Sequence, residues 1–461
     1  HATSKDALRV HDCLPSDWKD IERTALIDRP LFGSASYGRI RFHHRRVAEY
    51  LSACWLKRRM EMELPWSELE QLLFDKRKGR CVLKPSLASV AAWLVSLSQD
   101  SWSLRLRQSL LEHAPEVFLQ AGDPERLGTE FKKSAVDHFV RAFRDREWRR
   151  PDTDLATLSR LSDPAVASQI SAHVLDTSIA DQVRIELMRM AGQGRLEACK
   201  PALITVLRDE SSAPVLKALA LRSLHPMATS KERDEVAEIA TQWGELPEVI
   251  CDDLMEVVFP DNCTPEQWGA LVRKMEPERD YDTRRTTALF GGVTSVTDEV
   301  MLNDFLREIE AVLVATPHID EDGAAIPMSR EYAWLGSLAA DLLIWLLERP
   351  KLTQWQTEWA GRMVWRITHA RFHGVRGSSR ESFGKETLLH PQVRRIAYWL
   401  LAKDEKPDSR EPNRLSWVMA CNFDFPLNLS PTSADLFWLL EDSRGRPSVA
   451  EQVSCLFVAL R

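Results

Sequence analysis

Few groupings of residues in this chain could perform catalysis. His369 and His373 are four residues apart in a stretch that we expect to be helical, and this spacing can place two imidazoles on one metal ion. No third ligand stands nearby, so a solvated or packed histidine pair is the preferred interpretation. Residues 377–385 are glycine-rich but have the wrong spacing for a phosphate-binding loop, and no serine-hydrolase or zinc-protease motif is present. We therefore predict no catalytic residue and no metal site.

Charged residues are distributed unevenly, which indicates a binding role. Residues 232–282 contain fifteen acidic and four basic residues, a balance of −11, within a chain of net charge −7. Residues 362–397 contain eight basic and two acidic residues, a balance of +6, and residues 39–59 contain seven basic residues against one acid, Glu49. Surfaces of opposite sign favour complementary contact with a protein partner.

The centre of the second basic stretch is rich in glycine and serine, so we expect a surface loop there. Its candidate partner-binding residues are Arg376, Arg380 and Lys385. Because aromatic residues are interleaved with the arginines, nucleic acid is a second interpretation of this stretch. A third is that the charges form solvated helix faces and intramolecular ion pairs.

Composition predicts an all-α protein. Only 18 of 461 residues are glycine, which weakens helix interiors.

The eight cysteines are widely spaced without a C-x-x-C pair, which is typical of reduced thiols in a reducing compartment. The longest apolar stretches, residues 86–97 and 335–347, are shorter than the roughly 20 residues that a membrane-spanning helix needs. We therefore expect a cytoplasmic protein without membrane contact.

From Ala180 onward, apolar residues recur with a step of 33 residues. The recurring sets are Val183, Leu216 and Val249; Met188, Leu221 and Leu254; Ala191, Leu224 and Val257; and Val206, Ile239 and Val272. Each step has room for two helices, whose apolar faces would be buried by stacking on the neighbouring pair. Expected helix starts carry capping residues: Asp163, Thr229 with Glu232, and Thr264 with Gln267. The sequence therefore predicts an α-solenoid of HEAT-like helix pairs over residues 151–282.

Outside the repeats we expect less regular elements. Residues 37–42 alternate as a short strand after a turn at residues 33–36, and a helix follows with Val47, Tyr50, Leu51, Cys54 and Trp55 on its apolar face. Helices should fill residues 63–150, the first opened by a Ser67–Glu70 capping box, with a loop at residues 76–80. Residues 283–461 should continue the helical array irregularly, with further capping boxes at Thr353–Gln356 and Ser448–Glu451, and a loop at residues 316–327.

Residues 42–53, F-H-H-R-R-V-A-E-Y-L-S-A, resemble the end of the winged-helix domain in STAND NTPases of the NACHT type. That family has approximately F-x-H-x-x-x-x-E-[YF]-L-A-A there, preceded by a strand, and Ser52 departs from it. The resemblance implies that residues 1–62 end a winged-helix domain and that His44 contacts the phosphate of a nucleotide held upstream. The alternative for His44 is a buried, hydrogen-bonded core histidine.

The resemblance further implies a ligand-sensing region of a bacterial antiviral-defence protein. The parent would bind ATP or ADP with magnesium through an upstream NTPase domain, carry an effector, and form a homo-oligomer when a foreign, phage-encoded protein is sensed. Residues 1–461 themselves would hold no cofactor. The chain starts without Met and stops within an apolar-periodic stretch, so we expect part of a longer protein. The alternative is a stand-alone helical adaptor or regulatory subunit without a nucleotide role.

Overall fold

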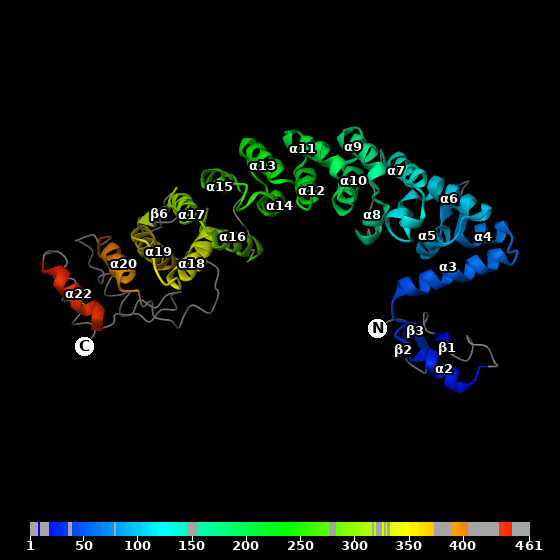
Figure 1. Ribbon diagram of the computed structural model, residues 1–461, viewed down its shortest axis with the longest axis horizontal. Coiled ribbons are helices and arrows are strands. Elements are labelled where there is room, and N and C mark those ends of the chain that lie inside the picture. The colour runs from blue at the N-terminus through cyan, green and yellow to red at the C-terminus, as the bar shows by residue number, and fades with distance from the viewer. Residues whose placement is uncertain are drawn as a thin grey trace. The chain divides into compact units, whose positions relative to one another are not determined.

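The computed structural model describes residues 8–9, 18–35, 39–77, 80–144, 155–275, 283–315, 318–319, 325–326, 329, 332–372, 390–403 and 433–444. These residues are mostly helical with little sheet, as expected for an all-α protein. The chain divides into two compact units, His1–Met227 and Ala228–Arg461, which are described separately below. Figure 1 labels their helices and strands.

The first unit begins with a small antiparallel sheet of order β1-β3-β2. Its elements are β1 (Leu8–Arg9), α2 (Asp20–Ile27), β2 (Phe32–Ala35) and β3 (Arg39–Phe42). The expected strand is confirmed as β3, but the turn expected at residues 33–36 is wrong, because most of that segment forms β2. Phe32 pairs with Phe42 across the two strands, and their rings lie 5.1 Å apart. This cross-strand aromatic pair stabilises the hairpin.

Helices and one further hairpin follow up to residue 144. They are α3 (Arg45–Glu61), α4 (Trp66–Leu73), β4 (Phe74–Arg77), β5 (Arg80–Leu83), η3 (Pro85–Leu87), α5 (Ala88–Ser96), α6 (Ser101–His113), η4 (Pro115–Leu119), η5 (Pro124–Arg126) and α7 (Thr129–Phe143). The expected Ser67–Glu70 capping box is wrong, because Pro65 is the N-cap and both residues lie inside α4. The loop expected at residues 76–80 is also wrong where described, since its ends belong to β4 and β5, which pair antiparallel.

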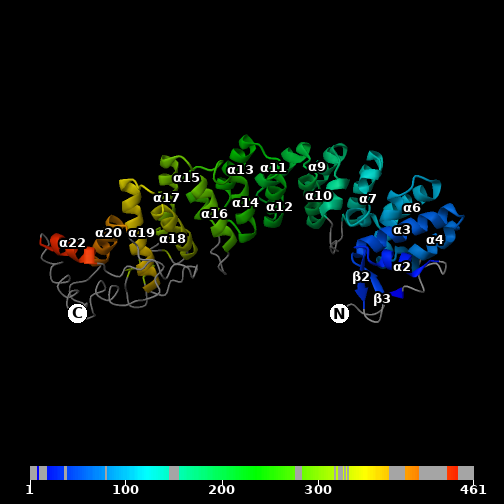
Figure 2. The same cartoon turned by 60° about the horizontal axis from the view of Figure 1, so that its bottom comes forward.

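The rest of the first unit forms two layers of helices. Its elements are α8 (Leu155–Leu161), η6 (Pro164–Val166), α9 (Ala167–Leu175), α10 (Asp181–Gln193), η7 (Glu197–Cys199), α11 (Lys200–Arg208) and α12 (Pro214–Leu224). Helices α7, α9 and α11 contact one another in sequence order, as do α8, α10 and α12. Contacts of α9 with α10 and of α11 with α12 join the two layers, which can be followed in Figure 2.

Two loops of this unit repeat the same local structure 33 residues apart. Asp176 accepts hydrogen bonds from the backbone N–H (2.9 Å) and hydroxyl (2.6 Å) of Ser178. Asp209 accepts the same two bonds from Ser211, at 3.0 and 2.7 Å. Each loop joins a helix of one layer to the next helix of the other layer. The 33-residue step of the apolar residues therefore also appears in these two loops. In each of them an Asp carboxylate accepts hydrogen bonds from a Ser two residues later, which stabilises the turn.

The second unit also consists of helices that contact near neighbours. Its elements are α13 (Ser230–Gln242), α14 (Glu248–Val258), α15 (Pro265–Val272), α16 (Thr283–Ser295), α17 (Glu299–Leu313), β6 (His318–Ile319), β7 (Ala325–Ile326), α18 (Ala333–Leu347), α19 (Gln354–Phe372), α20 (Pro391–Lys403) and α22 (Ser433–Ser443). Helices α13, α15, α17 and α19 contact in order, as do α14, α16 and α18. Within the segment 316–327, expected to be a loop, β6 and β7 form a short hairpin.

Most expected helix starts are confirmed. Capping boxes open α13 and α15. At α19, Thr353 and Gln356 exchange the two bonds of such a box. The Asp163 carboxylate accepts from the Ala165 N–H at the start of η6. The Ser448–Glu451 box lies outside the described residues.

The recurring apolar residues are buried, except for Val249. Val183 and Leu216 are at most 1% exposed, whereas Val249 is 47% exposed, so the inward position expected for Val249 is wrong. Val183 and Leu216 are the third residues of their helices, but Val249 is the second residue of α14. Ile250 takes the inward position instead and is 3% exposed.

In the part of the chain that the structure describes, four helices have their C-terminal carbonyls capped by a cation from later in the sequence. Lys84 Nζ donates to two carbonyls of α4 (2.7 and 2.9 Å), and Arg107 Nη2 donates to Val95 O (2.8 Å) and Ser98 O (2.9 Å) at the end of α5. Arg184 Nε donates to Val174 O (2.9 Å) of α9, and Lys274 Nζ donates to two carbonyls at the end of α13. The last carbonyls of a helix lack partners within the helix and carry partial negative charge, which these cations satisfy. We call these four contacts the cation caps.

Candidate interaction surface on helix α3

His44 lies at the junction of β3 and α3, where it is the N-cap residue with an extended backbone (φ −120°, ψ 130°). Its side chain is exposed and makes no capping bond to the helix. The neighbouring His43 donates its backbone N–H to Leu31 O (2.8 Å), which continues the β2–β3 pairing up to the helix start. The two imidazole rings stand edge to face, 4.8 Å apart. The interpretation of His44 as a buried core histidine is therefore wrong.

Positive charge gathers around this helix start. Arg41, Arg45 and Arg46 are all exposed, and Arg45 donates from Nε to Glu49 on α3 (2.8 Å). The N-terminus of a helix adds partial positive charge and backbone N–H donors. Together with the His44 imidazole, these groups could bind an anion such as a phosphate. Sequence reasoning identified His44 here but did not assign a role to Arg41.

Helix α3 packs against α5 with only part of the face that we expected. Ala53 and Leu56 are its buried residues, and the Tyr50 ring packs edge-on against Trp93 of α5 (5.2 Å). In contrast, Leu51 is 40% and Trp55 60% exposed. The expected core face is therefore wrong for Leu51 and Trp55, whereas Tyr50 does contact α5.

Three arginines of the basic stretch contact carboxylates within the protein. Arg362 of α19 donates to both carboxylate oxygens of Glu310 on α17 (2.8 and 2.9 Å), and Arg366 lies 3.4 Å from the same carboxylate. Arg394 is buried against Asp435. For these three residues the interpretation as intramolecular ion pairs is confirmed. No sequence signal points to Glu310, since it precedes Arg362 by 52 residues.

The candidate partner-binding residues Arg376, Arg380 and Lys385 lie outside the described residues, as does His373. His369 falls within α19. The structure therefore gives no geometry for the predicted loop or for the histidine pair.

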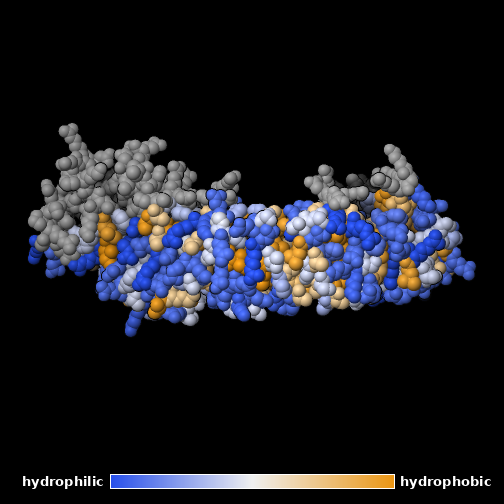
Figure 3. All heavy atoms as spheres, turned by 90° about the horizontal axis from the view of Figure 1, so that it is seen from above, coloured by the Kyte–Doolittle hydropathy of each residue, from blue (hydrophilic) through white to orange (hydrophobic). Residues whose placement is uncertain are grey.

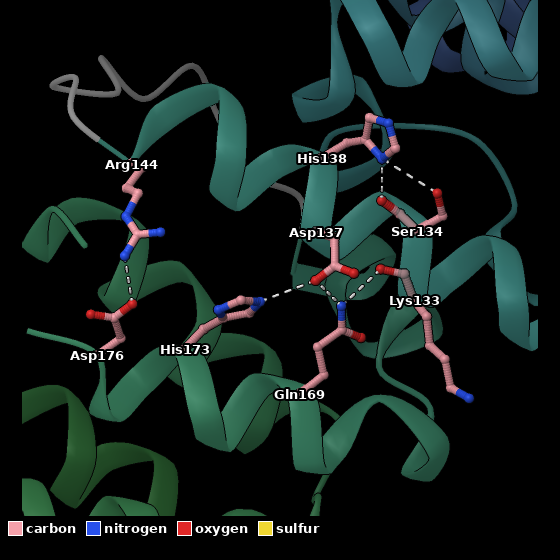
Figure 4. Close-up of polar contacts among 8 residues, drawn as sticks. All are labelled: Lys133, Ser134, Asp137, His138, Arg144, Gln169, His173 and Asp176. Carbon is pink, nitrogen blue, oxygen red and sulfur yellow. Dashed lines mark hydrogen bonds and ion pairs between the residues drawn. The ribbon is translucent and has the colours of Figure 1, made fainter. Parts of the chain in front are cut away.

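A polar cluster between α7 and α9 was not predicted. In Figure 4, Gln169 and His173 of α9 point to the same carboxylate, that of Asp137 on α7. His173 Nε2 lies 3.1 Å from Asp137 Oδ1, and Gln169 also donates to Lys133 O (3.0 Å). Near the ends of these two helices, Arg144 donates to Asp176 (2.9 Å). These pairs are 32 to 36 residues apart, close to the repeat step, so they tie successive helices of one layer.

The coloured part of the face drawn in Figure 3 is mostly hydrophilic. On the face drawn in Figure 3, hydrophobic side chains form small separate patches among hydrophilic ones. Among the described residues, no group of three or more His, Cys, Asp or Glu side chains is arranged to hold a metal ion. Within the same part of the chain, no helix combines the length and the apolar character needed to span a membrane.

Comparisons with protein-family models, with curated proteins and with solved structures find no match for this chain.

Proposed function

We propose that this chain is the ligand-sensing helical region of a bacterial STAND NTPase of the NACHT type, acting in antiviral defence in the cytoplasm. Its helices would form an α-solenoid of HEAT-like pairs. Support comes from the two-layered packing within each unit and from hydrogen bonds that join helices at sequence separations near 33 residues. An array of this kind offers an extended surface for a protein partner.

The observation that carries the nucleotide part of the proposal is the exposed position of His44 at the start of α3. The imidazole stands beside Arg45 and Arg46 at a helix N-terminus, a combination that suits a phosphate oxygen. The parent protein would supply the NTPase domain with ATP or ADP and magnesium. Here His44 is a sensing residue, which would report whether the nucleotide is present, and no residue of this chain is assigned to catalysis.

The sensed ligand is proposed to be a foreign, phage-encoded protein with surfaces complementary to the charged regions of this chain. Arg376, Arg380 and Lys385 remain the candidate contacts on the basic side. Ligand binding would favour a nucleotide-exchanging state of the parent and its homo-oligomerisation, provided that the ligand binds that state more tightly than the resting one.

The test compares His44→Ala with His43→Ala in the natural full-length protein. Both histidines are exposed and adjacent, so the second variant is a matched control for loss of an imidazole. We expect His44→Ala to lower the amount of nucleotide that co-purifies with the protein, measured by chromatography of the denatured sample, and His43→Ala to leave it unchanged. Equal nucleotide content in all three proteins would contradict the proposal. Calorimetry should detect no micromolar binding of ATP or ADP to residues 1–461 alone.

The second candidate is a stand-alone adaptor that binds a protein partner without nucleotide. The same helical array would support it. A natural gene product without any nucleotide-binding domain would favour this candidate and remove the first.

A further inference from the structure

The β4–β5 hairpin carries a concentration of positive charge that the proposed function does not use. Four of the five residues 76–80 are Lys or Arg. The two strands pair antiparallel, and the last pair of their ladder sets Arg77 opposite Arg80. Lys78 and Gly79, which join the strands, lie outside the described residues. A short stretch as rich in Lys and Arg as this one is typical of nucleic-acid-binding patches.

The base of the hairpin is fixed to the core of the first unit. Phe74 and Leu83 pair across the strands and are only 4% and 8% exposed. Next to them the Lys84 N–H donates to Leu73 O (2.8 Å), and strand β5 contacts α6. The last pair of the ladder lies three residues further along each strand, which is about 10 Å from this buried base. The fold therefore holds the basic end of the hairpin at a defined position.

The acidic groups that contact the hairpin lie below its last residue pair. Asp75 of β4 lies 3.7 Å from Lys84 Nζ, and Glu70 of α4 lies 3.7 Å from Lys76 Nζ. The Lys76 side chain is nevertheless 75% exposed. In the last pair, the residue directly opposite Arg77 is another cation. Like charges directly opposite each other destabilise a strand pair, so an anion bound at this end would relieve the repulsion.

We infer that the β4–β5 hairpin binds the phosphate backbone of double-stranded DNA, with Lys76, Arg77 and Arg80 as the contacting cations. The major groove of DNA is wide enough for a two-stranded β-ribbon. The duplex also carries one negative charge per about 1.7 Å of its axis, so neighbouring cations can each meet a phosphate. This inference adds a second ligand class to the protein ligand of the proposed function, and it does not depend on the role of His44.

A duplex fits this hairpin better than a single strand or an acidic protein does. Proteins that hold single strands stack the bases on aromatic side chains, and residues 75–82 contain no aromatic residue. Carboxylates on a protein surface are seldom as closely spaced as the phosphates of a duplex, whereas the cations of this hairpin are consecutive or directly opposite one another. The contacts would be to phosphates, so we expect binding without sequence preference.

Fluorescence anisotropy of a labelled DNA duplex of about 20 base pairs, titrated with residues 1–461, tests the inference. We expect binding at low salt, with log K falling against log salt at a slope of about −3, because three cations would displace counterions. Absence of binding at low salt would overturn the inference. Tighter binding of a single strand or of duplex RNA would also overturn it, as would displacement of the duplex by polyglutamate as readily as by unlabelled DNA.

Substitution of Arg80 separates DNA binding from folding of the hairpin. Arg80→Glu sets a carboxylate opposite Arg77, so the melting temperature should stay the same or rise. The affinity for DNA should nevertheless fall about tenfold or more, and Arg80→Gln should lie between this variant and the parent. Arg141→Glu is the matched control, since Arg141 is exposed on α7 of the same unit and its substitution changes the net charge equally.

The control should keep the affinity of the parent within about twofold. Equal losses in Arg80→Glu and Arg141→Glu would overturn the inference, because net charge alone would then explain the binding. Unchanged affinity in Arg80→Gln would overturn it as well, whatever the stability of Arg80→Glu.

Discussion

Arg394 of α20 and Asp435 of α22 form a buried ion pair in which both side chains are 2–3% exposed. Arg394 Nε lies 3.1 Å from each carboxylate oxygen, and Nη2 donates to Asp435 Oδ2 (2.5 Å) and to the Tyr398 hydroxyl (3.0 Å). Burial also raises the pKa of the Tyr398 hydroxyl above its usual value. Moving two charges out of water costs free energy. The burial of each of these two side chains is therefore stable only because the other one compensates its charge. The pair thus fixes α22 against α20 across 41 residues of sequence.

Asp435→Asn should release α22 from α20. The amide keeps the shape of the carboxylate but leaves the Arg394 charge uncompensated, which costs about 3–5 kcal/mol for a buried pair. Hydrogen exchange of α22 amides should accelerate accordingly. The double variant Arg394→Met with Asp435→Leu should restore most of the protection, because neither side chain then carries a buried charge. Unchanged exchange in Asp435→Asn would contradict the assigned role.

Two adjacent glycines of α16 should respond in opposite directions to alanine. A Cβ at Gly292 would lie 2.1 Å from the Phe259 ring, which packs edge-on against Phe305 (5.3 Å), so Gly292→Ala should cost about 1–3 kcal/mol. A Cβ at Gly291 would meet nothing within 4 Å, so Gly291→Ala should stabilise the helix by about 0.5–1 kcal/mol. Urea unfolding of both variants checks the pair, and a similar effect of the two substitutions would show that the Phe259 contact does not limit the site.

Arg107 should stabilise the C-terminal end of α5. Arg107→Met removes the side-chain donor of the Val95 carbonyl and leaves the Ser98 carbonyl with the Ser103 hydroxyl alone, at a cost of about 1–3 kcal/mol. Amide exchange in α5 should rise and thermal stability should fall. Arg105→Met is the matched control, because Arg105 lies on the exposed side of the same helix, over the Trp66 ring. Equal effects of the two substitutions would argue against the cap.

Glu116 of η4 should make stability fall as the pH rises. Burial raises the pKa of its carboxyl group, so the folded protein holds this proton more tightly than the unfolded chain does. The loss of folding stability caused by ionising Glu116 is absent below the unfolded pKa of about 4.3, and it grows as the pH rises through the folded pKa. Glu116→Gln should therefore be more stable than the parent at pH 7, and the advantage should shrink at acidic pH. Parallel stability curves for the two proteins would contradict this.

Local signals predicted the helix starts well. The Thr229–Glu232 and Thr264–Gln267 boxes are formed as the sequence indicates, because a capping box depends on residues within one turn. The Ser67–Glu70 pattern failed, since Pro65 is the N-cap and the helix begins two residues earlier than that pattern requires. The 33-residue step located inward residues such as Val183 and Leu216, but it failed at Val249, where α14 begins one residue out of register.

Contacts between helices far apart in the sequence were harder to predict from the sequence. The apolar periodicity of α3 marks Leu51 and Trp55 as its core face, yet contact with α5 buries Ala53 and Leu56 instead. A periodic pattern shows that a face is apolar, and it does not show which neighbour covers that face. Similarly, the excess of arginine in residues 362–397 indicated an external partner, whereas Arg362 and Arg394 find carboxylates far away in the sequence. Such pairs follow from the packing of helices, which composition alone does not determine.

The cation caps have a consequence for the order in which the helices fold during translation. Lys84 follows α4 by the two strands β4 and β5, Arg107 and Arg184 lie in the α-helix next after the one that each caps, and Lys274 follows α13 by two helices. As the ribosome releases the chain from its N-terminus, the end of each of these helices has to wait for a cation that has not yet been made. Each of these four helices is therefore completed only after the translation of a later part of the chain. In a nascent chain stalled just before Lys274, the carbonyls at the end of α13 would lack the donor that Lys274 supplies.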